Sequence, residues 1–288
     1  MNKRFSIIPL ILLGGIGLTG CMENAALMKL SKDGSGTLTY RIFMSTEMMQ
    51  MAQGMSSGMG GDAEGGEVDL SSLNPIESIK KDMADKFGDA ATLESTKDIE
   101  NKQGWKGIEA IYSFEDVNKL NLANMGDEMD SGGGGGATGG SMANMGTPYR
   151  FEFVGGDVAT LKIVPITTDE AAAEAAVEAA AEEMPEEIAD MGMDDLGLAM
   201  MKPMIAGMRI TLLVAVDGDI VDTNSKFRSE KHANVVTVMD IRMDQLFDHP
   251  EAMSLMSAGD DGANKLAELN LPGVKIEDPK KEITISFK

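Results

Sequence analysis

Apolar and polar residues alternate along much of this chain, a period of two that is typical of strands with one buried face. The alternation is clearest in residues 105–114, 149–153, 209–216 and 283–287. Turn residues rich in glycine separate several of these runs, and such turns favour antiparallel hairpins. The chain is therefore expected to contain several strand pairs.

A DGSG turn joins the first two extended runs, 26–32 and 37–43. It resembles part of a calcium-binding EF-hand loop. With Gly36 at the invariant glycine position, however, the first and last ligand positions fall on Ser31 and Ile42, where carboxylates are required. We therefore predict a hairpin here, without calcium.

Asp217-Gly218 is the second strong turn signal. It predicts a hairpin between residues 209–216 and 220–227. Residues 235–241 would then add a third antiparallel strand. The expected result is a meander of three consecutive strands.

Helical spacing is found in three stretches. Asn74 and Pro75 are suited to the N-cap and first position of a helix that ends at Gly88. Residues 168–190 are rich in Ala and carry Glu at every fourth position, which favours a solvated helix. An acidic surface for a cationic partner or divalent ions is the alternative. The run 194–208 is the third helical stretch.

Together these elements predict an α+β fold: an antiparallel β-meander sheet with helices packed on one face. Stretches rich in Gly and Met at 54–70 and 124–146 have little to bury and are expected to be long mobile insertions. No single hairpin can bury a core alone, so residues 21–288 are predicted to form one composite domain. Two subdomains, 21–122 and 147–288, are the alternative.

The N-terminus reads MNKRFSIIPLILLGGIGLTGC. Its apolar run is too short to cross a membrane as a helix, and its basic start is typical of a secretory signal peptide. Leu18-Thr19-Gly20-Cys21 resembles the lipobox of bacterial lipoproteins, which implies removal of residues 1–20 and a lipid on Cys21. Two or three acyl chains give stable anchoring. The next residue is Met22 rather than Asp, which favours the outer membrane.

The chain is strongly acidic. Loss of Lys3 and Arg4 with the signal peptide lowers the formal net charge from −22 to −24. Such a chain is not expected to bind nucleic acid, or to bind anionic lipids through its overall charge. Because Cys21 is the only cysteine, the core must hold the fold without a disulfide.

Catalytic motifs are absent from the sequence: it contains no HExxH, GxSxG or Walker loop, and no GxGxxG after a strand. His232 and His249 lie in polar surroundings and are expected to be exposed. No spacing singles out a pair among the many carboxylates. We therefore expect no enzymatic activity, with a carboxylate-based hydrolase as the alternative.

Methionine is abundant, with 25 residues, and two clusters stand out. Thioethers are ligands that suit Cu(I), although copper sites usually add His or Cys. A copper site is therefore the alternative hypothesis for the first cluster. That cluster includes Met44, Met48, Met51 and Met55. Methionine side chains are flexible and apolar, and they also suit adaptable binding surfaces. For the second cluster we predict such an apolar binding surface. It comprises Met200, Met201, Met204 and Met208.

Several segments together resemble a group of uncharacterised bacterial lipoproteins of the planctomycete type. These segments are the lipobox, KDGSGTLTYRI, GWKGIEAIYSFEDVNKLNL, MRITLLVAVDGDIVDTNS and PGVKIEDPKKEITISF. The resemblance implies neither a known activity nor catalytic residues. The sequence thus predicts a lipid-anchored protein of the cell envelope, facing the periplasm or the surface. We expect a binding or structural module for an apolar ligand or an envelope protein, with no cofactor besides the covalent lipid.

Overall fold

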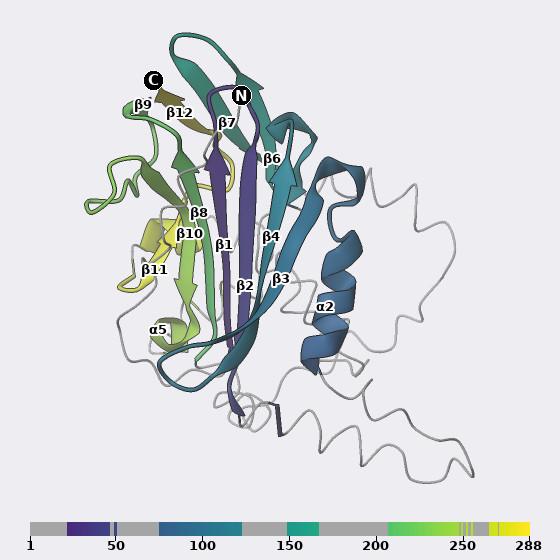
Figure 1. Ribbon diagram of the computed structural model, residues 1–288. Helices are drawn as coiled ribbons and strands as arrows, with labels where there is room; N and C mark the ends of the chain where they lie inside the picture. Colours follow the sequence, from purple (N-terminus) through teal and green to yellow (C-terminus); the bar gives the residue numbers. More distant parts are fainter. Residues whose placement is uncertain are drawn as a thin grey trace, which may run out of the picture.

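The computed structural model describes residues 22–46, 49–50, 75–122, 149–166, 207–247, 249, 252, 255, 265–269 and 271–288. Residues 1–21, the predicted insertions at 54–70 and 124–146, and the stretch 168–190 lie outside the described residues. Within the described part, twelve strands form one sheet of seven strands and one of five (Figure 1). The described part of the chain is therefore mostly β, and the prediction of an α+β fold with helices on one face of a meander is wrong.

The larger sheet is built around the N-terminal hairpin. Its strands in spatial order are β11 (Val274–Ile276), β10 (Val235–Arg242), β8 (Arg209–Val216), β1 (Met22–Leu30), β2 (Gly36–Met44), β4 (Lys106–Phe114) and β3 (Thr92–Glu100). The neighbours are antiparallel except β1 and β8, which run parallel. The hairpin predicted at the DGSG turn is confirmed, and the alternation predicted for residues 105–114 corresponds to β4.

The smaller sheet collects strands from the second half of the chain. In spatial order these are β5 (Asn121–Leu122), β6 (Tyr149–Val154), β7 (Ala159–Pro165), β12 (Ile283–Phe287) and β9 (Ile220–Thr223). All of its neighbours are antiparallel. The alternation in residues 149–153 corresponds to β6, which pairs with β7.

The meander predicted for residues 209–241 is wrong. Strand β8 pairs with β10, whereas β9 crosses to the smaller sheet and pairs with β12. At the turn, the Asp217 N–H donates to the Leu30 carbonyl (2.8 Å). An Asp-Gly dipeptide marks a change of chain direction, but distant partners decide which sheet receives the next strand.

One buried core lies between the inner faces of the two sheets. Leu38, Tyr40 and Leu212 enter it from the larger sheet, and Leu161 and Ile285 from the smaller one. This burial follows the alternation seen in the sequence, because successive side chains of a strand point to opposite faces. Residues of both 21–122 and 147–288 line the core, and the division of the chain into domains stays a prediction.

Helix α2 (Pro75–Asp85) confirms the helix predicted after Asn74 and lies beside β3 and β4 (Figure 1). The buried Tyr112 hydroxyl donates to the Met83 carbonyl (2.8 Å). The Phe87 ring meets Tyr112 edge-on, with centroids 4.8 Å apart. These contacts fix the C-terminal end of α2 to the sheet.

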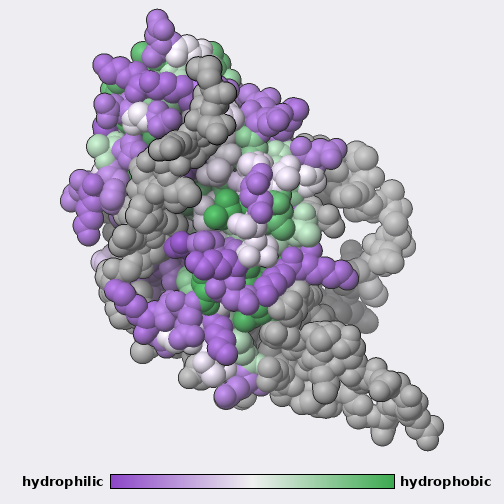
Figure 2. Space-filling view, in the orientation of Figure 1, coloured by the Kyte–Doolittle hydropathy of each residue, from purple (hydrophilic) through white to green (hydrophobic). Residues whose placement is uncertain are grey.

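The other described helical elements are short. They include α5 (Met243–Phe247), the 3-10 turns η3 (Gly88–Ala90) and η4 (Val117–Lys119), and helical residues at 265–269. No helix among the described residues has the length and apolarity to cross a membrane. Hydrophilic residues dominate the described surface seen in Figure 2, and apolar residues show in a smaller central area.

Candidate functional site

One end of the larger sheet lies next to the residue predicted to carry lipid. Strand β1 begins at Met22, whose Cα is about 3.8 Å from that of Cys21 along the chain. The ladder places four residues in one row: Met22 opposite Met44, Met44 opposite Lys106, and Lys106 opposite Glu100. We call this the proximal end of the sheet, and the end with the DGSG turn the distal end.

Methionines line the core side of the proximal end. The row consists of Met243, the first residue of α5 after β10, Met208, which directly precedes β8, Met22 of β1 and Met44 of β2. The Met243 N–H donates to the Met208 carbonyl (2.9 Å), and Met22 and Met44 are direct partners. All four are between 1% and 6% exposed. Their thioethers therefore fill the core at this end.

This row contains one member of each predicted methionine cluster, Met44 and Met208. The other members lie outside the described residues: Met48, Met51, Met55, Met200, Met201 and Met204. The copper and apolar-binding hypotheses for the two clusters stay predictions. For Met44 and Met208, burial gives a packing role in the described structure.

The outer face of the proximal end carries alternating charges on neighbouring strands. We call Glu109, Arg41, Glu23, Arg209 and Asp240, from β4 to β10, the charged ladder. Glu109–Arg41 and Glu23–Arg209 are directly opposite each other, and the other neighbours are diagonal. Arg41 Nε donates to Glu109 Oε2 at 2.6 Å. Arg209 donates from Nε (2.8 Å) and Nη2 (3.0 Å) to the two carboxylate oxygens of Asp240.

Glu23 lies in the middle of this charged ladder. Its Oε1 is 3.9 Å from Arg209 Nη1. Burial raises the pKa of the Glu23 carboxyl, and the attraction of Arg209 offsets only part of this effect. The ladder therefore sets three carboxylates against two guanidinium groups, and Glu23 is the carboxylate that burial partly desolvates.

The β3–β4 turn, residues 101–105, extends past the proximal row. Asn101 Oδ1 accepts from the Trp105 N–H (3.0 Å), and Asn101 and Trp105 also bond through their backbones (3.0 Å). Gly104 completes the turn with φ +78°. Trp105, the only tryptophan, is half-buried, and Lys102 and Lys106 beside it are exposed. Sequence reasoning missed this turn, although a lone Trp between two lysines was a visible signal.

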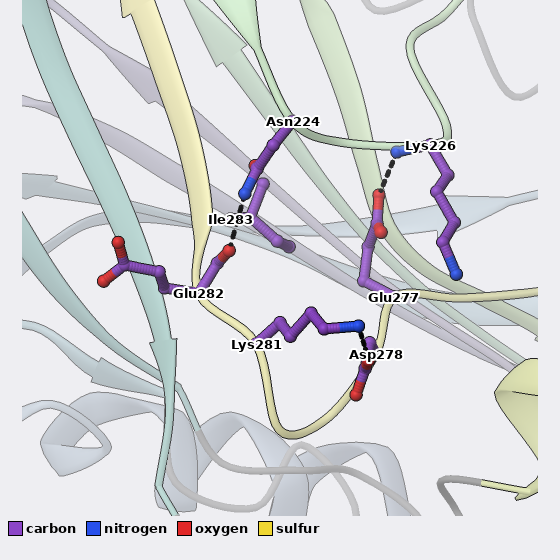
Figure 3. A pocket seen from close by; sticks show the side chains of 7 residues that line it. All are labelled: Asn224, Lys226, Glu277, Asp278, Lys281, Glu282 and Ile283. Atoms are coloured by element: carbon purple, nitrogen blue, oxygen red, sulfur yellow. Dashed lines mark hydrogen bonds and ion pairs between the residues drawn. The ribbon is translucent and has the colours of Figure 1, made fainter.

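A small cavity of about 60 Å³ lies between the segment after β9 and the β11–β12 loop (Figure 3). Glu277 is 5% exposed and accepts from Ser225 Oγ (2.6 Å) and the Lys226 N–H (2.8 Å). Asn224 Nδ2 donates to the Glu282 carbonyl (2.9 Å). The cavity is small and Glu277 is satisfied by the protein, so we interpret the region as a latch between two loops.

Ligand chemistry is sparse in the described part of the chain. There, no group of three or more His, Cys, Asp or Glu side chains is placed to hold a metal ion. His232 and His249 are half-buried rather than exposed as predicted. In the DGSG turn, Asp33 Oδ1 accepts from the Ser35 N–H (3.1 Å) and Oγ (2.6 Å), which closes the hairpin.

No protein-family model matches the chain, and no curated protein matches it. Among solved structures, the chain is similar to the NMR structure of the folded domain of LppM from Mycobacterium tuberculosis. The identity is 12% and the TM-score 0.32, over 96% of this chain and 94% of that chain. A likeness of this size carries no argument about function, and the planctomycete-type resemblance stays a prediction.

Proposed function

We propose that the chain is a lipid-anchored lipoprotein of the bacterial cell envelope, held to a membrane by acyl chains on Cys21. The body is a non-catalytic binding or structural module for an apolar ligand or another envelope protein. Met22 after the acylated cysteine favours the outer membrane as its location.

The observation that carries this proposal is the position of Cys21. It follows Leu18-Thr19-Gly20 and directly precedes the first paired strand residue, because Met22 already pairs with Met44. No linker separates the acylated residue from the sheet. Such a connection would hold the proximal end at the membrane, which suits a body that works at the lipid surface.

Acylation is tested in cells supplied with a labelled fatty acid. The native chain is expected to incorporate the label and to sediment with membranes. Cys21→Ser removes the only thiol, so label and membrane association should both be lost. Ser35→Ala, in the DGSG turn at the distal end, is a matched control that should keep both. An unlabelled native chain would refute the proposal, as would a Cys21→Ser chain that remains on membranes.

The binding role is tested separately by native mass spectrometry. The Cys21→Ser chain carries no covalent lipid, so any lipid mass retained after purification reports a bound apolar ligand. Retention of a defined lipid supports the ligand-binding form of the proposal. If the chain keeps its bare mass after incubation with envelope lipids, it does not bind an apolar ligand. The proposal of a structural module then remains.

A further inference from the structure

We infer that the β3–β4 turn contacts the headgroup region of the membrane beside the lipid anchor, with Trp105 and the two lysines Lys102 and Lys106 as its contact residues. The inference rests on the proposed function and deepens it. It gives the body a second, non-covalent contact with the bilayer, and two contacts fix an orientation that one anchor leaves open.

The placement follows from strand register. Met22, which follows Cys21, lies in the same row as Lys106 of β4, with only β2 between them. Strands are spaced about 4.8 Å apart, so β4 lies about 10 Å from β1. The turn continues beyond Lys106 at the same end of the sheet, opposite the DGSG turn (Figure 1). A membrane that holds Cys21 is therefore within reach of the turn.

The residue types suit an interface between lipid and water. Trp has a large apolar ring and one polar N–H, and it is enriched where membranes meet water. Lysine places its apolar stem along such a surface and keeps its ammonium group among phosphates. Lys102 and Lys106 are both exposed, and Trp105 is half-buried.

The charge of the turn itself also favours this contact, although the chain as a whole is acidic. The three carboxylates of the charged ladder share two arginines, Arg41 and Arg209, which leaves one net negative charge there. Asp244 after β10 is paired with Arg242 (2.9 Å). The turn adds two lysines, against the single exposed acid Glu100 in the same row. The phosphates of anionic lipids therefore meet a locally basic tip.

The turn is also held in shape before any contact. Asn101 Oδ1 accepts from the N–H groups of Gln103 and Trp105, both at 3.0 Å. The Gly104 N–H donates to the Asn101 carbonyl (3.0 Å). A rigid turn loses little conformational freedom when it seats on a surface, which favours binding.

The chain offers a direct test, because it has one cysteine and one tryptophan. The chain from Cys21 onward is coupled through that thiol to a maleimide-bearing phospholipid. The vesicles contain phosphatidylethanolamine and phosphatidylglycerol, with or without bromine-labelled acyl chains. Coupling should shift the Trp105 emission to shorter wavelength, bromine should quench it, and iodide in the buffer should quench it less than in the uncoupled chain.

A double variant, Trp105→Phe with Val154→Trp, is the matched control. Val154 is 70% exposed in the β6–β7 hairpin, beside Phe153, whose ring lies against Gly34 at the distal end. Its tryptophan should stay accessible to iodide and unquenched by bromine. The inference is overturned if coupling leaves the Trp105 emission unchanged, or if bromine quenches the distal tryptophan as strongly.

Charge reversal tests the lysines. Lys102→Glu and Lys106→Glu should each reduce the bromine quenching of Trp105. Lys32→Glu makes the same charge change at the distal end, on an exposed residue, and should not. If all three variants reduce the quenching equally, the effect depends only on the overall charge of the chain, which would contradict the role of the turn.

Chemical coupling separates this inference from the proposed function. A chain that is not acylated in cells but responds in the coupled vesicles refutes the lipoprotein proposal alone. A chain that is acylated in cells but shows no Trp105 response refutes the membrane contact alone.

Discussion

Asp219 and Lys288 form a reciprocal pair of backbone hydrogen bonds. The Asp219 N–H donates to the Lys288 carbonyl (3.0 Å), and the Lys288 N–H donates to the Asp219 carbonyl (3.1 Å). The pair lies where the chain leaves β8 of the larger sheet and enters β9 of the smaller one. The last residue of the chain therefore helps to hold the crossover between the sheets.

Gly218→Ala should destabilise this crossover. Gly218 has φ +143°, and an added Cβ would lie 2.3 Å from the Lys288 carbonyl oxygen. The strained backbone and the clash should lower the free energy of unfolding by about 1–3 kcal/mol, measured by urea denaturation. Gly156→Ala is the control, because its nearest contact is 3.4 Å and its φ is not strained. Equal stability of the two variants would contradict this account.

Tyr112→Phe should weaken the attachment of α2. The substitution removes the hydroxyl that donates to the Met83 carbonyl and leaves that carbonyl buried without its donor. We expect a loss of about 1–2 kcal/mol in the free energy of unfolding. Ser113→Ala, which removes an exposed hydrogen bond to Glu94, should cost less. A Tyr112→Phe chain as stable as the native one would show that the bond contributes nothing.

Glu277→Ala should loosen the latch between the loops after β9 and β11. The Ser225 hydroxyl and the Lys226 N–H would both lose their acceptor. The expected loss is about 1–3 kcal/mol in chemical denaturation. Glu282→Ala removes an exposed partner of Lys162 and should cost less than about 1 kcal/mol. The latch interpretation fails if the ranking of these two variants is reversed.

Glu23→Gln should change how stability depends on pH. A raised carboxyl pKa means that the folded chain holds the proton more tightly than the unfolded chain. The contribution of Glu23 is therefore fully present below its ordinary pKa of 4.5 and is lost as pH rises through the raised folded value. The variant lacks this loss, so it should gain stability relative to the native chain between acidic and neutral pH.

The measurement is the free energy of unfolding of both chains across that pH range. Glu152→Gln removes an exposed carboxylate and controls for the change in net charge. A constant difference between Glu23→Gln and the native chain at all pH values would show that Glu23 titrates alike in both states.

Local signals in the sequence were sufficient for much of the secondary structure. The alternation in residues 105–114 and 283–287 predicted strands β4 and β12, and Asn74-Pro75 predicted the start of α2. The DGSG turn predicted the β1–β2 hairpin, because a glycine at φ +86° and an aspartate acceptor close it locally. Each of these features depends on residues close together in the chain.

The candidate site was less predictable, because its parts are distant in sequence. The charged ladder joins Glu23 to Arg209 only through the parallel pairing of β1 with β8. The row of buried methionines depends on the same pairing. Nothing in the residues around Met22 indicates that strand β8, almost two hundred positions later, is its neighbour.

The sequence by itself determined several strands, the DGSG turn and which faces of those strands are apolar, and it predicts a lipid on Cys21. Only the tertiary structure decided that there are two sheets rather than one meander with helices. The physical reason is that alternation indicates that one face of a strand is buried, but it does not indicate which other strands pack against that face. The choice of partner depends on how the strand faces fill one shared core, and on backbone bonds such as that between Asp219 and Lys288.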